Sequence, residues 1–446
     1  MSCIEYVQKR SGAVVPFTPD RITNAIYRAA VAVGGRDKET AQNLSTQVVA
    51  ILEEQCKDGH TPHVEEIQDI VEKVLIEYGH ATVAKAYILY RDEQARKRKE
   101  QAKASSIPAE NVPWAKVWQV LDWAIDHDVH TVSSLNRRIA AGEFAQIVSE
   151  SEKAYEEDVD GAADLMLERS SDLKIVIITG PSSSGKTTTT IKIGERLKRK
   201  KLKLVTLNVD NYFFDLEMHP KDEFGDYDFE TPQALDMKLV NEHINKLLNG
   251  EEIMVPFYDF KTGRRTGEVT PMRIAKNEII LIDSLHGLYG EMTKDIPAEK
   301  QFRLYLEPLM QMKDDSGHYV RWTDIRLMRR MLRDAAHRAY DTTQTLLHWH
   351  YVRSSEMRNI IPYIHTTDYI INSAMPYELP LYAQRLLPDF KRWVKEYKGD
   401  PLRLDAYTRA ERLDTLLSTI TPVSDDIAVP SNSVLREFIG GSSLKY

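Results

Sequence analysis

The chain has 446 residues, more than one hydrophobic core usually supports, so its length predicts at least two domains. A net charge of -8 argues against general affinity for nucleic acid or an anionic membrane, and two cysteines are too few for a disulfide framework or a cysteine-rich zinc site. The first ten residues have no apolar leader, and no apolar run could span a bilayer, so we expect a cytoplasmic protein that binds small molecules.

The first ninety residues predict a small, mainly helical domain. Two alternating stretches, 4–10 and 13–17, are typical of a short hairpin. Apolar residues then recur at helical spacing from Pro19 onward, over 39–55, from about residue 61 and after Gly79. Periodicity alone leaves open whether this domain binds a ligand or is purely structural.

This segment resembles the ATP-cone, the regulatory nucleotide-binding module of ribonucleotide reductases and of the repressor of their genes. The resemblance covers residues 1–93 and is carried by 7–12, 15–17, 66–72 and 83–91. It implies a site for ATP or dATP as effector. The residues that it places at the phosphates are Lys9, Arg10 and Arg21, and those at the base are Val7 and Ile22. Arg21 stands where the family usually has Lys, which keeps the charge and changes the geometry.

A linker is expected over residues 94–113, and a run of charged residues from Asp92 to Lys103 forms its first part. The basic stretch 96–99 leaves nucleic-acid binding as an alternative, but interspersed Glu93 and Glu100 favour a solvated helix end.

Residues 114–170 show helical spacing, and we expect them to attach to the domain that follows. Within them, the stretch from Asp126 to His130 contains metal-ligand residue types. No neighbouring ligand completes a site, so a metal is not expected there.

A phosphate-binding loop is the strongest motif of the chain. Residues 180–187, Gly-Pro-Ser-Ser-Ser-Gly-Lys-Thr, fit G-x-x-x-x-G-K-[ST] between an apolar stretch at 174–179 and an amphipathic helix at 188–200. Strand, turn and helix aim backbone N–H groups at one point, which is how phosphates are held. We expect ATP there, with Lys186 at the β- and γ-phosphates and Thr187 on Mg²⁺.

The second half alternates strands and helices, which predicts an α/β fold with a doubly wound parallel sheet over residues 171–446. The expected buried strands are 174–179, 203–208, 278–283, 302–306 and 368–372. Ligands of such sheets bind beyond the carboxyl ends of the strands. Asp210 and Asp283 lie there. Asp210 could act as a base for an acceptor hydroxyl, and Asp283 could hold Mg²⁺ directly or through water. The alternative is that Asp210 only caps a turn and Asp283 only caps a strand end.

Four arginines lie three and four residues apart on a predicted helix: Arg326, Arg329, Arg330 and Arg333. They share a face that could close over transferring phosphates, and the alternative is a solvated face. His348 and His350 are two residues apart, which on a helix points them in different directions, so they do not predict a metal pair.

Residues 130–446 resemble the uridine kinase and phosphoribulokinase family of P-loop kinases. The matching stretches are 180–188, 209–213, 227–232, 257–260 with 264–265, 324–334 and the tail 435–443. The implied catalytic residues are Asp210 and Lys186, and the implied metal ligands are Thr187 and Asp283. The implied ATP-binding residues are Gly180, Ser182, Ser183, Ser184, Gly185, Lys186, Thr187, Thr188, Arg329, Arg330 and Arg333. The implied acceptor-binding residues are Asp210, Asp228, Tyr258, Arg326, Arg338 and Gln344.

Two departures leave the acceptor open. Asp283-Ser284 stands where the family usually has Glu-Gly, and the histidine of the acceptor loop is not evident between Phe260 and Arg265. The first hypothesis is a nucleoside kinase, expected to be a homo-oligomer regulated at the cone. The alternatives are a kinase of a sugar phosphate or phosphoglycerate, and a nucleotide-sensing regulator without turnover.

Overall fold

The structure, a computed structural model, describes residues 4–9, 14–35, 37–56, 60–91, 111–219, 231–260, 262–337, 341–400 and 403–445. The chain divides into two compact units, and each is described by itself. The first unit holds the described residues up to 91 together with 395–400 and 403–408, and the second holds those of 111–394 and 409–445. In the described part of the chain, no helix combines the length and apolarity needed to cross a bilayer.

The first unit begins with the predicted hairpin and continues with the predicted helices. Strands β1 (Tyr6–Gln8) and β2 (Val14–Pro16) pair antiparallel. The helices that follow are α1 (Pro19–Ala32), α2 (Lys38–Gln55), α3 (Val64–Glu77) and a helical stretch at 81–91. Pro19 occupies the first helical position, where its missing N–H costs nothing, but the side chain of Thr18 makes no capping bond.

A compact apolar core joins these helices. Val48, Val74 and Leu75 are fully buried in it, as the helical spacing of apolar residues predicts. Arg91, at the end of the 81–91 helix, donates to Glu65, Asp69 and Glu72 of α3 at 2.6–2.7 Å. The hairpin and helices therefore form a small domain with its own core.

The second unit is built on a five-stranded sheet in which every neighbouring pair is parallel. Its strands are β3 (Ile175–Thr179), β4 (Lys203–Thr206), β7 (Glu278–Asp283), β8 (Gln301–Glu307) and β9 (Tyr369–Asn372). Their order is β4-β7-β3-β8-β9, with β3 at the centre and buried along its whole length. The predicted α/β fold and its five strands are confirmed.

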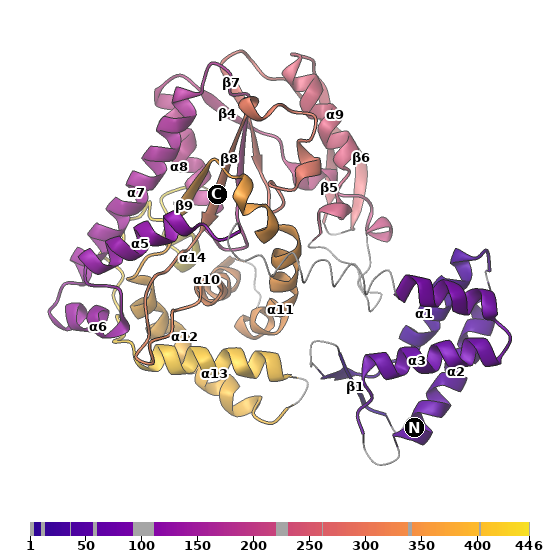
Figure 1. The fold of residues 1–446 in the computed structure, drawn as a ribbon. Coiled ribbons are helices and arrows are strands. Elements are labelled where there is room, and N and C mark those ends of the chain that lie inside the picture. The colour runs from indigo at the N-terminus through magenta and orange to yellow at the C-terminus, as the bar shows by residue number, and fades with distance from the viewer. Residues whose placement is uncertain are drawn as a thin grey trace. The chain divides into compact units, whose positions relative to one another are not determined.

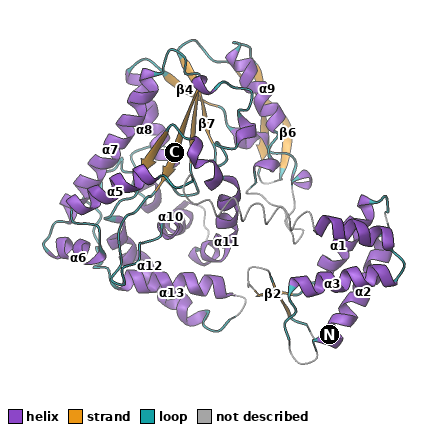
Figure 2. Cartoon of the chain, viewed as in Figure 1, coloured by secondary structure: helices purple, strands orange, loops and turns teal. Residues whose placement is uncertain are grey.

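Helices cover both faces of this sheet (Figure 2). From residue 114 onward the described helices are α5 (Trp114–Asp126), α6 (Val132–Ala140), α7 (Phe144–Glu168), α8 (Lys186–Arg199), α9 (Met237–Leu248), α10 (Trp322–His337), α11 (Thr342–Asn359), α12 (Glu378–Glu396), α13 (Leu404–Ser418) and α14 (Arg436–Ile439). Helices α7 and α8 run along one side of the strands, and α9 lies on the other (Figure 1). Ile175 and Ile177 of β3 both pack in the core that contains Ile244 of α9, as expected for alternate residues of a strand, which share one face.

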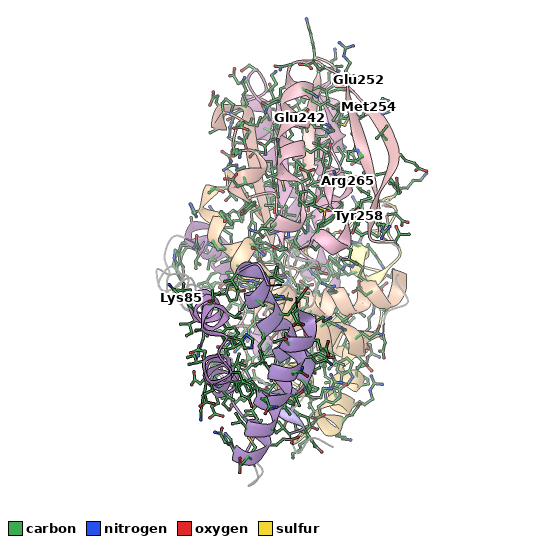
Figure 3. The ribbon with its side chains drawn as sticks, turned by 90° about the vertical axis from the view of Figure 1, so that its right-hand side faces the viewer. Lys85, Glu242, Glu252, Met254, Tyr258 and Arg265 are labelled. Atoms are coloured by element: carbon green, nitrogen blue, oxygen red, sulfur yellow. The ribbon has the colours of Figure 1, made fainter. Side chains whose placement is uncertain are left out.

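An antiparallel hairpin that the sequence did not predict lies beside α9. Strands β5 (Ile253–Asp259) and β6 (Arg264–Met272) pair with Tyr258 opposite Arg265. Figure 3 shows these two residues toward one end of the hairpin and Met254 toward the other. The sequence did not indicate β5 because Pro256 argues against a strand. It did not indicate β6 because that strand is largely exposed and polar and shows little apolar alternation.

Candidate active site

The loop between β3 and α8 has the backbone of a phosphate cradle. Gly185 has φ +94° and Ser183 has φ +62°, both in the left-handed region. A Cβ on Gly180 would stand 2.4 Å from the carbonyl oxygen of Leu306, so only glycine fits against β8 at this point. The loop therefore opens at the carboxyl ends of the central strands and leads directly into the first turn of α8.

A cavity of about 410 Å³ lies at this loop. Its lining comprises Ser182, Ser183, Ser184, Gly185, Lys186, Thr187, Asp210, Phe213, Leu235, Phe260, Ser284, Leu285, His286, Arg330, Arg333 and Glu437. The structure thus brings together most of the predicted donor site and Asp210, from segments that are distant in sequence. Gly180 and Thr188 flank the cavity lining without belonging to it.

Lys186 is held in place by the loop itself. Its Nζ donates to the carbonyl oxygen of Gly180 at 2.9 Å. Burial lowers the pKa of this ammonium, while the negative charges of Asp283 and Glu437 act in the opposite direction. Lys186 is half-buried and lines the cavity, where its charge can receive an anionic ligand.

Asp210 lies in a single turn of 3₁₀ helix, Val209–Tyr212, that follows β4. The side chain of Asn208 caps this turn by accepting from the backbone N–H of Asp210 at 3.1 Å. Burial, and the nearby charge of Asp283, raise the pKa of Asp210, against the effect of Lys186. Burial also raises the pKa of Asp283. The charge of Lys186 acts on both acids, and the charge of Asp283 acts on Asp210. The two acids therefore lie near Lys186, where their positions after β4 and at the end of β7 lead us to expect them.

Two of the four predicted arginines face the cavity. Arg330 donates to the hydroxyl of Ser182 at 3.3 Å. Arg330 and Arg333 also pair with Asp334, one to each carboxylate oxygen, at 3.2–3.3 Å. Asp334 thus orients both guanidinium groups beside the phosphate loop.

The other two arginines are buried inside the unit, which differs from their predicted contacts with ligands. Arg326 pairs with Glu307 of β8 and Glu356 of α11 at 2.5–2.9 Å, and its Nη1 also donates to the carbonyl oxygen of Ser182. Burial alone would lower the pKa of Arg326, but these two carboxylates raise it.

Arg329 has 0% of its side chain exposed and pairs with Glu378 of α12 at 2.7 Å. It also donates to the hydroxyl and carbonyl oxygens of Ser373. With most of their donors taken by buried partners, Arg326 holds α10 to β8 and α11, and Arg329 holds it to α12, rather than presenting charge to a phosphate or a ribose.

The predicted acceptor residues are only partly assembled. Tyr258 is buried on β5 outside the cavity lining, but its ring lies 5.5 Å from that of Phe213 and 5.0 Å from that of Phe260, which both line it. Gln344 lies on α11 and is exposed, outside the cavity lining. Asp228 and Arg338 lie outside the described residues.

Three kinds of lining residue were not predicted. The aromatic rings of Phe213 and Phe260 form one wall, and both belong to the quoted motifs. His286 follows the end of β7, and burial lowers its pKa to about 4. Glu437 comes from the C-terminal tail, 249 residues from its hydrogen-bond partner Thr188, and no local pattern could have indicated that contact.

In the first unit, the predicted effector residues lie on and around the hairpin. Ile22 is buried in the core of the cone, and Val7 packs against that core from a half-buried position. Lys9 and Arg21 are described, whereas Arg10 lies outside the described residues.

The residues at the loop fit a magnesium ion. Mg²⁺ is usually held by one or two carboxylates or hydroxyls, with phosphate oxygens and water completing the shell. Thr187 and Asp210 line the cavity, and Asp283, which is not part of the lining, lies close enough to Lys186 for the two charges to interact. In the described ranges, no group of three or more His, Cys, Asp or Glu side chains could hold a metal alone, and His127 instead stacks on Trp123.

A parallel α/β sheet with this loop, with Asp283 at the end of the adjacent strand β7 and Asp210 just beyond β4, is the arrangement of P-loop phosphotransferases. Residues 175–379 match the model of the Phosphoribulokinase / Uridine kinase family, and residues 5–96 match the ATP cone domain. The chain belongs to the phosphoribulokinase and uridine kinase family and carries an N-terminal ATP cone.

Individual relatives agree with both parts. A uridine kinase of Anoxybacillus flavithermus is 30% identical over 164 residues, which cover 37% of this chain and 68% of that protein. The vitamin B12-dependent ribonucleoside-diphosphate reductase of Thermoplasma acidophilum is 44% identical over 103 residues, but the chain spans only 13% of its length. The solved D-glycerate 3-kinase of Cryptococcus neoformans aligns at 14% identity and a TM-score of 0.31, covering 46% of this chain and 87% of that one.

Proposed function

We propose that the protein transfers the γ-phosphoryl group of ATP to the 5′-hydroxyl of a nucleoside. The observation that carries this proposal is the single cavity that holds Lys186, Asp210 and the aromatic rings of Phe213 and Phe260. Cation, base and a surface suited to a nucleobase are the three elements that such a reaction requires.

In the proposed reaction, Asp210 accepts the proton of the acceptor hydroxyl as its oxygen attacks the γ-phosphorus. The bond from the γ-phosphorus to the bridging oxygen breaks, and ADP leaves with that electron pair. Lys186, Arg330 and Arg333 offset the charge that develops on the phosphoryl oxygens. Mg²⁺, when bound at Thr187 and Asp283, supplies further charge neutralisation on the donor phosphates.

The environment of Arg265 favours a nucleoside over a phosphorylated acceptor. A sugar phosphate or phosphoglycerate needs additional cations near Tyr258. The candidates are Lys261, which lies outside the described residues, Arg264, which is exposed, and Arg265, which stands opposite Tyr258 in the hairpin. Arg265 donates to the carbonyl oxygens of Tyr212 and Phe213 and pairs with Asp236 at 3.3 Å. A guanidinium that is engaged in this way is a poor partner for a second phosphate, because these contacts would have to break.

An acceptor panel with purified protein tests the proposal. ADP release is measured with uridine, cytidine, a pentose phosphate and a phosphoglycerate, for the wild type, Lys186→Ala and the control Lys203→Ala, whose exposed side chain pairs with Glu278. We expect activity with a nucleoside that Lys186→Ala abolishes and Lys203→Ala preserves. Turnover with a phosphorylated acceptor alone would contradict the nucleoside kinase and support a kinase of a sugar phosphate or phosphoglycerate. No turnover with any acceptor would favour a nucleotide-sensing regulator.

We further propose that the cone, at residues 1–93, binds ATP or dATP as an effector and changes kinase activity through subunit association. A second nucleotide module in a chain that has its own phosphate loop supports this, because the chemistry does not need it. Coupling of this kind is typically about 1–3 kcal/mol.

The test compares the full chain with Arg21→Ala and the control Lys85→Ala, which changes an exposed lysine of the cone. Binding stoichiometry, molecular mass and rate are measured across dATP concentrations. A single nucleotide site, with mass and rate independent of dATP, would make the cone structural.

A further inference from the structure

The C-terminal tail packs directly on the phosphate loop. A Cβ on Gly185 would stand 2.5 Å from Cγ2 of Val434, so the tail leaves no space beyond the loop backbone there. The ring of Phe438 lies 5.0 Å from the guanidinium of Arg329, and the hydroxyl of Ser433 donates to the buried Glu152 at 2.5 Å. These contacts fix the tail on both sides of Glu437.

Glu437 places a carboxylate at the N-terminus of α8. Its Oε2 accepts from the backbone N–H of Thr188 at 3.2 Å and from the Thr188 hydroxyl at 2.9 Å. Glu437 is 8% exposed and lines the same cavity as Lys186. The carboxylate is therefore an element of the phosphate cavity.

The Thr188 N–H is among the groups that a nucleotide uses. In a phosphate loop, the backbone N–H groups that lead into the helix cradle the α- and β-phosphates. Thr188 follows the Lys186-Thr187 pair and belongs to this row. A carboxylate offers the same charge and acceptor oxygens as one face of a phosphate. Two anions in contact repel each other, so Glu437 and a phosphate cannot share this N–H at low cost.

We propose that Glu437 is a built-in competitor of the nucleotide. Glu437 accepts from Thr188 when no phosphate is bound, and it must leave Thr188 when the triphosphate enters. The tail therefore weakens ATP binding, and the position of the Glu437 side chain depends on whether the loop is occupied. This inference rests on the proposed ATP site. The opposite role, in which Glu437 stays in place and positions Thr188 for ATP, predicts the opposite change in affinity.

The test uses Glu437→Gln in the full chain, because glutamine keeps the size of the side chain and removes its charge. Glu437→Asp is a second variant, which keeps the charge but withdraws it from Thr188. The control is Asp425→Asn, which removes a charge from an exposed position of the same tail. The dissociation constant of ATP is measured by calorimetry, and Lys186→Ala separates binding at the loop from binding at the cone.

We expect both Glu437 variants to bind ATP more tightly at the Lys186-dependent site, by roughly tenfold for Glu437→Gln, since a charge-assisted hydrogen bond no longer competes. ATP should also raise the melting temperature of Glu437→Gln more than that of the wild type or Asp425→Asn. Unchanged or weaker ATP binding in folded Glu437→Gln overturns the inference while the ATP site stands. Absence of Lys186-dependent ATP binding in the wild type overturns the proposed function instead.

Discussion

Replacing Arg329 by methionine should destabilise the second unit without a direct effect on nucleotide contacts. The substitution leaves Glu378, whose side chain is 0% exposed, without its cation. Removing one partner of a buried ion pair costs about 3–5 kcal/mol, because the remaining charge stays desolvated. For a unit of this size, with an unfolding entropy of about 2.1 cal/mol/K per residue, that corresponds to a fall in melting temperature of roughly 5–8 °C.

The matched variant is Arg333→Met on the same helix. Asp334 keeps Arg330 when Arg333 is lost, so we expect a cost of only about 1 kcal/mol. Its effect should appear in kcat/KM for ATP, with a loss of roughly tenfold to a hundredfold for one charged phosphate contact. Thermal unfolding and initial rates are measured for both variants. If Arg329→Met unfolds like the wild type but loses affinity for ATP, the structural role of Arg329 is refuted.

Three further substitutions test the cavity. Asp210→Asn should lower kcat by about 10²–10⁴ with little change in the KM for ATP, as loss of a base predicts, and a change confined to that KM would place Asp210 in the donor site. Gly185→Ala should cost about 2–5 kcal/mol from left-handed strain and the clash with Val434, and a wild-type melting temperature would contradict that. His286 has its pKa lowered to about 4, so stability is full above pH 6.5 and falls by about 3 kcal/mol as pH drops to 4. His286→Gln should flatten that dependence in pH-resolved unfolding, and an unchanged slope would count against it.

The sequence was sufficient for the sheet and for the centre of the site. Runs of β-branched residues such as Ile175-Val176-Ile177-Ile178 predict strands buried on both faces, and the glycine-rich motif predicts the turn that follows. Because parallel strands end at one edge, Asp210 and Asp283 could be placed together before their geometry was known.

Contacts between distant segments could not be predicted in this way. Glu437 and Thr188 are hydrogen-bonded although 249 residues separate them in sequence, and no sequence pattern near Glu437 indicates this partner. The β5–β6 hairpin was missed because its second strand is largely exposed and therefore lacks the apolar alternation that identifies strands. What decided these features is tertiary packing, which local spacing does not encode.

The arginines of α10 show why spacing along a helix identifies a face but not a function. Arg326, Arg329, Arg330 and Arg333 do share one face, yet the helix rises by about 1.5 Å per residue, so roughly 10 Å separates the first from the last. At the level of Arg326 and Arg329, that face meets the carboxylates of Glu307, Glu356 and Glu378. One turn further, at Arg330 and Arg333, the same face opens onto the phosphate loop. Arg326 and Arg329 are buried whereas Arg330 and Arg333 are half-buried, so substitutions only four residues apart on one face should affect different properties: stability at Arg329 and nucleotide affinity at Arg333.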